Sequence, residues 1–115
     1  MSEGSEVLLV LTNCPDADTA GRLRRELVKA RLAACVNQFG SVQSTYRWQG
    51  AIEEASEVTL LIKTTRDRYA ALEAELRRLH PYSVPEIIAI AVERGSSDYL
   101  TWVRAETRAD TDQNG

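Results

Sequence analysis

The first third of the chain shows two different spacings of apolar residues. The segment "EVLLVLT" (residues 6–12) is a short apolar run rich in β-branched side chains, which is typical of a buried strand. After Pro15, which ends strand pairing, apolar residues recur every three or four positions and predict an amphipathic helix: Ala20, Leu23, Leu27, Ala30 and Ala34. Asp16 or Asp18 is expected to cap this helix by accepting a hydrogen bond from a free backbone amide.

A period of two follows, and it predicts a long β-hairpin. One side of the chain carries Val42, Ser44, Tyr46 and Trp48, and the positions between them are polar. Gln49-Gly50 is a turn signal, after which residues 51–64 run extended for a comparable distance.

The predicted hairpin is longer than the rest of the fold can cover. Arms of roughly twelve to fourteen residues, at about 3.3 Å per residue, extend beyond two helices of ordinary length. Its tip carries Tyr46, Trp48 and Ile52, which would form an exposed apolar edge in a monomer. These three residues are therefore expected to pair with another subunit.

The second half of the chain repeats the order of helix and strand. Helical spacing of apolar residues predicts a helix over 65–79, with Thr65 as a possible cap. Pro81 and Pro85 bracket a rigid loop, because each proline fixes its own φ and restricts the residue before it. Residues 86–92, "EIIAIAV", predict a fourth strand, and residues 96–107 a short helix capped by Ser96 or Ser97.

The predicted order is strand, helix, strand, strand, helix, strand and a short final helix. This order is the βαββαβ pattern of a ferredoxin-like α+β sandwich, with two helices on one face of an antiparallel sheet. We expect one domain over residues 1–115, with an ordered core of about residues 6–107 and two flexible ends.

Composition narrows the classes of function. The net charge of −3 argues against a nucleic-acid binder, which needs a concentrated cationic face. The longest apolar run, "IIAIAV", is too short to cross a bilayer, and the acidic start does not resemble a secretory signal. Two cysteines are too few for a disulfide scaffold and are expected to be reduced thiols. We therefore expect a soluble, cytoplasmic protein.

Sequence motifs typical of enzymes are absent. No serine or cysteine stands in a recognisable nucleophile motif, and the chain contains no GxGxxG or Walker loop. The metal-binding spacings CxxC and HExxH are also missing. We expect a protein that binds rather than catalyses.

Four motifs in order resemble a known family, the CutA divalent-cation tolerance proteins. They are "ACVN" (34–37), "STYRWQGAIEEASE" (44–57), "LIKT" (61–64) and "HPYSVPEI" (80–87). The resemblance runs from about Val7 to Glu106. It implies a compact ferredoxin-like homotrimer whose hairpins extend into neighbouring subunits, an architecture similar to that of the PII signalling proteins. It also implies a role in tolerance of divalent metals and binding of copper.

The only histidine, His80, is the first candidate for a metal ligand, because neutral imidazole suits copper, zinc and nickel. The alternative is a residue at the end of a helix, where the ring bonds the last carbonyls. Cys14 and Glu57 are further candidate ligands. The alternatives are that Cys14 is an ordinary thiol and that Glu57 is a solvated carboxylate. Some relatives carry a cysteine and a second histidine where this chain has Thr12 and Leu79. No cofactor is expected to be obligatory; the expected metal is Cu(II) or another divalent transition metal.

Lys63, Tyr82 and Glu86 are candidates for a ligand cleft between subunits, because they stand at predicted strand ends. Alternatively, Lys63 pairs with an acid and Tyr82 packs at the interface. Two functions follow: a homotrimer that binds copper for metal tolerance, or a PII-like regulatory module that binds a small anionic ligand and signals through an unknown partner. A trimeric scaffold with incidental metal contacts is a third alternative.

Overall fold

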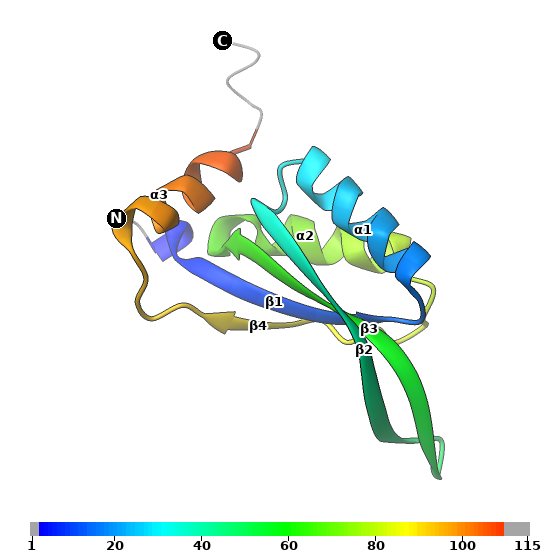
Figure 1. Ribbon diagram of the computed structural model, residues 1–115. Helices are drawn as coiled ribbons and strands as arrows, with labels where there is room; N and C mark the ends of the chain where they lie inside the picture. The colour runs from blue at the N-terminus through cyan, green and yellow to red at the C-terminus, as the bar shows by residue number, and fades with distance from the viewer. Residues whose placement is uncertain (1–2, 110–115) are drawn as a thin grey trace.

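The computed structural model describes residues 3–109 and confirms the ferredoxin-like α+β fold. A short 3-10 helix η1 (Glu3–Ser5) precedes β1 (Val7–Cys14), α1 (Ala17–Lys29), β2 (Cys35–Trp48), β3 (Ala51–Thr65), α2 (Arg66–Leu79), β4 (Ile88–Ala91) and α3 (Ser97–Glu106). The strands form one antiparallel sheet in the order β2-β3-β1-β4. Helices α1 and α2 lie side by side over one face (Figure 1). Residues 1–2 and 110–115 lie outside the described residues, so the prediction of flexible ends is not addressed for them. Within residues 3–109, no helix is long and apolar enough to cross a membrane.

The core lies between this face of the sheet and the two helices. Leu23 and Leu27 from α1 and Leu72 and Leu76 from α2 are fully buried against the sheet residues Val10, Leu60 and Ile62. Along β1 the side chains alternate, so that Leu8, Val10, Thr12 and Cys14 face the helices. The predicted amphipathic helices and the buried first strand are therefore confirmed, except that α1 ends at Lys29, so Ala30 and Ala34 of the predicted apolar stripe lie beyond the helix.

Helix caps resolve two of the alternatives left by the sequence. Asp16 caps α1, its Oδ1 accepting from the Thr19 amide at 2.8 Å. Ser96 caps α3 in the same way through the Tyr99 amide at 3.3 Å. Thr65 occupies the N-cap position of α2, but its hydroxyl donates to Asp67 at 2.6 Å and makes no cap bond.

The fourth strand is shorter than the sequence pattern predicts. It pairs with β1 at four positions only, and its first residue, Ile88, lies opposite Leu11. Before it, Pro85 supplies no backbone donor, and Glu86 bonds the side chain of Asn13 instead of joining the ladder. The apolar run "EIIAIAV" therefore starts inside a loop.

The hairpin of β2 and β3 extends beyond the rest of the sheet, as the sequence predicts. Its register runs to Trp48 opposite Ala51, with an irregularity between Phe39 and Val42. Strand β1 pairs with β3 only from Val58 onward, so the outer half of the hairpin projects from the body as two strands (Figure 1). Here Tyr46, Trp48 and Ile52 are 44%, 43% and 65% exposed.

The face of the sheet opposite α1 and α2 is apolar along much of its length. The register places on one side a set of residues that we call the open face: Leu9, Leu11, Phe39, Leu61, Ile88 and Ile90. Helix α3 contacts β1 and β3 at the end of the sheet where Val7 is buried. Ile88 and Ile90 remain 50% and 52% exposed, so α3 leaves much of the open face uncovered.

Candidate functional site

His80 follows α2, and both nitrogens of its ring are engaged in hydrogen bonds. Its backbone amide donates to the Leu76 carbonyl at 2.8 Å, which ends the helix. Nε2 lies 2.7 Å from the carbonyl oxygen of Asn13, so Nε2 carries the proton and donates. Nδ1 then accepts from the amide of Tyr82 at 3.2 Å. The buried ring joins the end of β1 to the proline-bracketed loop, and neither nitrogen has a free lone pair.

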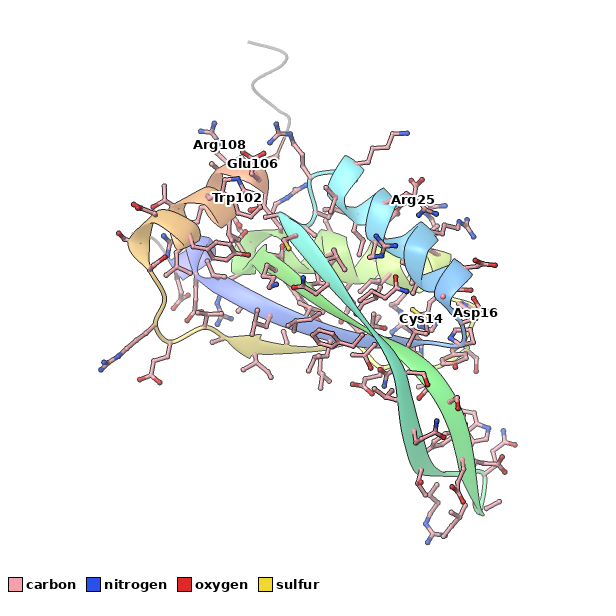
Figure 2. All side chains as sticks on the ribbon, viewed as in Figure 1. Cys14, Asp16, Arg25, Trp102, Glu106 and Arg108 are labelled. Carbon is pink, nitrogen blue, oxygen red and sulfur yellow. The ribbon has the colours of Figure 1, made fainter. Side chains whose placement is uncertain are left out.

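Cys14, the second expected ligand, is a fully buried thiol on the helix side of β1. It lies beside Asp16 where β1 leads into α1 (Figure 2). Burial, with the nearby carboxylates of Asp16 and Glu57, raises the pKa of this thiol to about 11. Cys14 is therefore protonated at neutral pH, whereas a metal needs the thiolate.

The donor set of one chain does not fit a resident copper ion. Within residues 3–109, no three His, Cys, Asp or Glu side chains are grouped so that they could hold a metal. His80 would have to give up its bond from Tyr82, and Cys14 its proton, before either became a ligand. The expected ligands His80, Cys14 and Glu57 are thus not assembled within a single subunit.

The buried thiol gives a testable difference between folded and unfolded protein. Cys14 is expected to resist alkylation by iodoacetamide at pH 8 and to react only after denaturation, because both its exposure and its thiolate fraction are low. The pKa of the Cys14 thiol is higher in the folded protein than in the unfolded chain. Its contribution to the free energy of unfolding is therefore fully present below the ordinary pKa of 9.0 and is lost as pH rises through about 11. Peptide mapping by mass spectrometry measures the labelling. Equal labelling of Cys14 in native and denatured protein would contradict the assignment.

A cleft of about 710 Å³ lies where the hairpin leaves the sheet, and we call it the hairpin cleft. The hairpin, the end of β1 and the proline-bracketed loop supply its lining: Asn13, Gln43, Ser44, Thr45, Tyr46, Trp48, Glu57, Tyr82, Ser83, Val84 and Glu86. Tyr82 and Glu86 thus line one cleft within a single chain. Among the lining residues there is no lysine or arginine.

Neutral donors hold both carboxylates of the hairpin cleft. The Tyr82 hydroxyl donates to Glu57 Oε2 at 2.9 Å, and Asn13 Nδ2 donates to Glu86 Oε1 at 3.1 Å. Asn13 is itself oriented by Thr59, whose hydroxyl donates to Asn13 Oδ1 at 2.6 Å. Burial, together with the bond to Glu57 and its charge, raises the pKa of Tyr82 to about 12. The cleft therefore has a negative potential.

Sequence reasoning misplaced one residue of the cleft and missed another. Glu57 is buried, with 8% exposure, so the alternative of a solvated carboxylate is wrong. Asn13 received no role, although its place two residues after Leu11 puts it on the open side of β1. The alternation of side chains along β1 was therefore the signal that could have placed Asn13 on this side.

Lys63 lies apart from Tyr82 and Glu86 within one chain. Its ammonium group donates to Asn37 Oδ1 and lies 3.9 Å from Cys35 Sγ. The partner of Lys63 is thus an amide and not the acid that the alternative supposed. Cys35 is half-buried at the start of β2.

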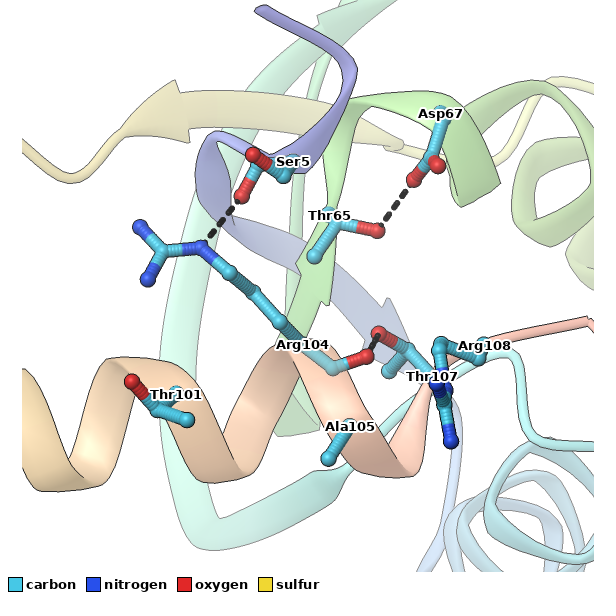
Figure 3. A pocket seen from close by; sticks show the side chains of 8 residues that line it. All are labelled: Ser5, Thr65, Asp67, Thr101, Arg104, Ala105, Thr107 and Arg108. Atoms are coloured by element: carbon cyan, nitrogen blue, oxygen red, sulfur yellow. Dashed lines mark hydrogen bonds between the residues drawn. The ribbon is translucent and has the colours of Figure 1, made fainter. Parts of the chain in front are cut away.

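A second cavity, of about 430 Å³, lies between α3, η1 and the start of α2 (Figure 3). Arg104 reaches from α3 and donates from Nε to the Ser5 carbonyl at 2.8 Å. Thr65 and Asp67 bond each other across the start of α2. The first contact attaches α3 to η1 and the second joins the end of β3 to the start of α2, which indicates a structural role.

Comparison with known proteins agrees with the fold and the motifs. The model of the CutA1 divalent ion tolerance proteins matches residues 8–106. A divalent-cation tolerance protein CutA from Thermus thermophilus is 42% identical over 99 residues, covering 86% of this chain and 96% of the relative. Protein CutA from Homo sapiens is 43% identical over 106 residues, which are 92% of this chain but only 59% of the human protein.

Solved structures give the same result. CutA from Xylella fastidiosa matches with a TM-score of 0.87 and 47% identity, covering 90% of this chain and 99% of that one. A protein from Archaeoglobus fulgidus, described as a periplasmic divalent cation tolerance protein, matches with a TM-score of 0.86 and 32% identity over 89% of this chain and 99% of that one. With the family model covering most of its length, this chain belongs to the CutA1 divalent ion tolerance protein family.

Proposed function

We propose that the protein acts in divalent-cation tolerance as a homotrimer, and that it binds Cu(II) with donors from more than one subunit. The observation that carries the proposal is the open face, an apolar surface that the described part of the chain covers only at one end. Catalysis is not part of this proposed role.

Two surfaces support assembly. The open face exposes Ile88 and Ile90, and an apolar surface of this kind in a small protein marks an interaction site. The outer half of the hairpin adds Tyr46, Trp48 and Ile52 on two strands that no third strand flanks. Burying both surfaces against further copies of the chain removes apolar area from water and pairs open strand edges.

The hydrogen bonds of His80 are the reason for placing the proposed copper site between subunits. Imidazole is a ligand that copper favours, but here Nδ1 is occupied by the Tyr82 amide and no group of metal-ligating side chains surrounds the ring. A neighbouring subunit is the source from which further donors are expected. An anion in the hairpin cleft has less support, because Glu57 and Glu86 line it and Lys63 does not.

Native mass spectrometry with and without a small excess of Cu(II) tests this proposal. We expect a trimer that takes up a fixed whole number of copper ions and loses them when His80 is replaced by glutamine. A Lys29→Gln variant, at an exposed position of α1, is the control. A trimer that takes up no copper, or takes it up equally without His80, would contradict the metal proposal and leave assembly in place. A monomer would contradict the assembly proposal.

A cytoplasmic location is also proposed. Both cysteines are free, which suits a reducing compartment. A protein from Archaeoglobus fulgidus with the same fold is described as periplasmic, so the location needs its own measurement, cell fractionation of the native protein.

A further inference from the structure

We propose that the hairpin cleft is a binding site for a small organic cation, a protonated amine that lies between the carboxylates of Glu57 and Glu86 and against the rings of Tyr46, Trp48 and Tyr82. This ligand is neither the copper ion of the proposed function nor the anion expected from PII-like architecture, and the inference does not depend on copper binding.

Glu57 lines the hairpin cleft with an incomplete set of hydrogen-bond donors. Glu57 is 8% exposed, yet its hydrogen-bond partner is a neutral phenol and no described lysine or arginine forms an ion pair with it. A buried carboxylate is costly unless a cation or several donors compensate it. One oxygen of Glu57 accepts from Tyr82, and the structure assigns no protein donor to the other among the described residues.

The second carboxylate, Glu86, is exposed, and like Glu57 it is held by one neutral donor. Glu86 accepts on Oε1 from Asn13, again a neutral donor, and Oε2 receives no bond from the described residues. The two carboxylates come from different elements, β3 and the proline-bracketed loop, and both line one cavity. Each is oriented by a bond to one oxygen, which leaves an acceptor for the N–H groups of an ammonium ion.

The aromatic lining of the hairpin cleft favours an organic cation over a metal ion as the ligand. Tyr46 and Trp48 on the hairpin and Tyr82 on the loop are 44%, 43% and 37% exposed and line the same cavity. Aromatic faces attract ammonium groups and contact the methylene groups next to them. A cavity of about 710 Å³ is of the size that small-molecule ligands occupy. A bare divalent ion would need a tight group of three or more ligands, which residues 3–109 do not provide.

The electrostatics of neighbouring groups agree with this geometry. The charge of Glu57 contributes to the raised pKa of Tyr82 on one side and of Cys14 on the other, although burial is the larger cause for both. A bound cation would oppose this potential. In the proposed trimer Tyr46 and Trp48 also approach a neighbouring subunit, so the cleft would lie at a subunit boundary.

The experiment uses 1,4-diaminobutane as the probe and 1,4-butanediol as its uncharged match. Binding is measured by calorimetry on the assembled protein, and by fluorescence in a Trp102→Phe background, in which Trp48 is the remaining indole. We expect the diamine to bind and the diol not to bind. Glu57→Gln and Glu86→Gln are each expected to weaken binding about tenfold or more, because each removes a charge-assisted bond. The matched control is Glu54→Gln, which removes an exposed charge from the same hairpin outside the cleft.

Assembly is measured by native mass spectrometry on the same samples, so failure of the trimer and failure of the cleft are separable. Weaker binding in Glu57→Gln and Glu86→Gln, with Glu54→Gln unchanged, supports the site. Equal binding of the diol, equal loss in Glu54→Gln, or no binding because a neighbouring copy fills the cleft overturns it. Displacement of the diamine by Cu(II) or Mg(II) at the same carboxylates would identify a metal site instead and also overturns it.

Discussion

Replacing Ile90 by glutamate is expected to convert the proposed trimer into monomers. Ile90 lies on the open face opposite Leu9 and is 52% exposed in one chain, so a carboxylate there does not disturb the core of the subunit. At a subunit interface the same carboxylate would be buried without a partner, at a cost of several kcal/mol for each charge.

Light scattering after size-exclusion chromatography measures this effect. Ala74→Glu, on the exposed side of α2, introduces the same charge away from the open face and is expected to leave the trimer intact. Circular dichroism checks that the Ile90→Glu subunit is folded. A folded Ile90→Glu trimer with unchanged mass would show that the open face is not the assembly surface.

The second large effect is expected in the core, from Leu60→Ala. Leu60 is fully buried in the middle of β3, where it packs in one cluster with Leu23 of α1 and Leu72 of α2. Truncating a buried leucine removes its apolar contacts and leaves a cavity, which lowers the free energy of unfolding by about 2 to 5 kcal/mol.

Urea denaturation at one fixed subunit concentration measures the loss, because the stability of an oligomer depends on concentration. Val28→Ala provides the control: Val28 is 44% exposed on α1, and such a surface change is expected to shift stability by about 0.5 kcal/mol or less. A loss below about 1 kcal/mol in Leu60→Ala would mean that this core site relaxes around the cavity.

The elements of the fold were predictable from sequence because each has a strong local signal. The spacing of Leu23 and Leu27 sets the buried side of α1, and the alternation from Val42 to Trp48 sets the hairpin. Asp16 and Ser96 were found as cap candidates because a short polar side chain before a helix bonds free amides. The predicted length of β4 was wrong because Glu86 and Ile87 belong to the loop that follows Pro85 and do not pair with β1, which the apolar run does not reveal.

The candidate site was less predictable because its residues meet across the fold. His80 was placed correctly at a helix end, but the partners of its two nitrogens, Asn13 and the Tyr82 amide, depend on tertiary contacts. Lys63 and Tyr82 were grouped because both stand near strand ends, yet Lys63 lies on β3 beside Asn37 and Tyr82 lies in the loop before β4, on the hairpin cleft. A hydropathy pattern gives the face on which a residue lies but not the residue it touches.

The projecting hairpin also affects the risk of aggregation while the chain is being synthesised. Residues 35–65 leave the ribosome before α2 and β4 are made, so the two-stranded ribbon and its open edges are exposed while the chain is unfinished. Two-stranded ribbons of this kind tend to join other chains edge to edge. On this ribbon Glu53 stands opposite Tyr46 and Glu54 opposite Thr45. The two carboxylates are expected to repel wrongly paired copies, so that nascent chains stay soluble until the correct partners arrive.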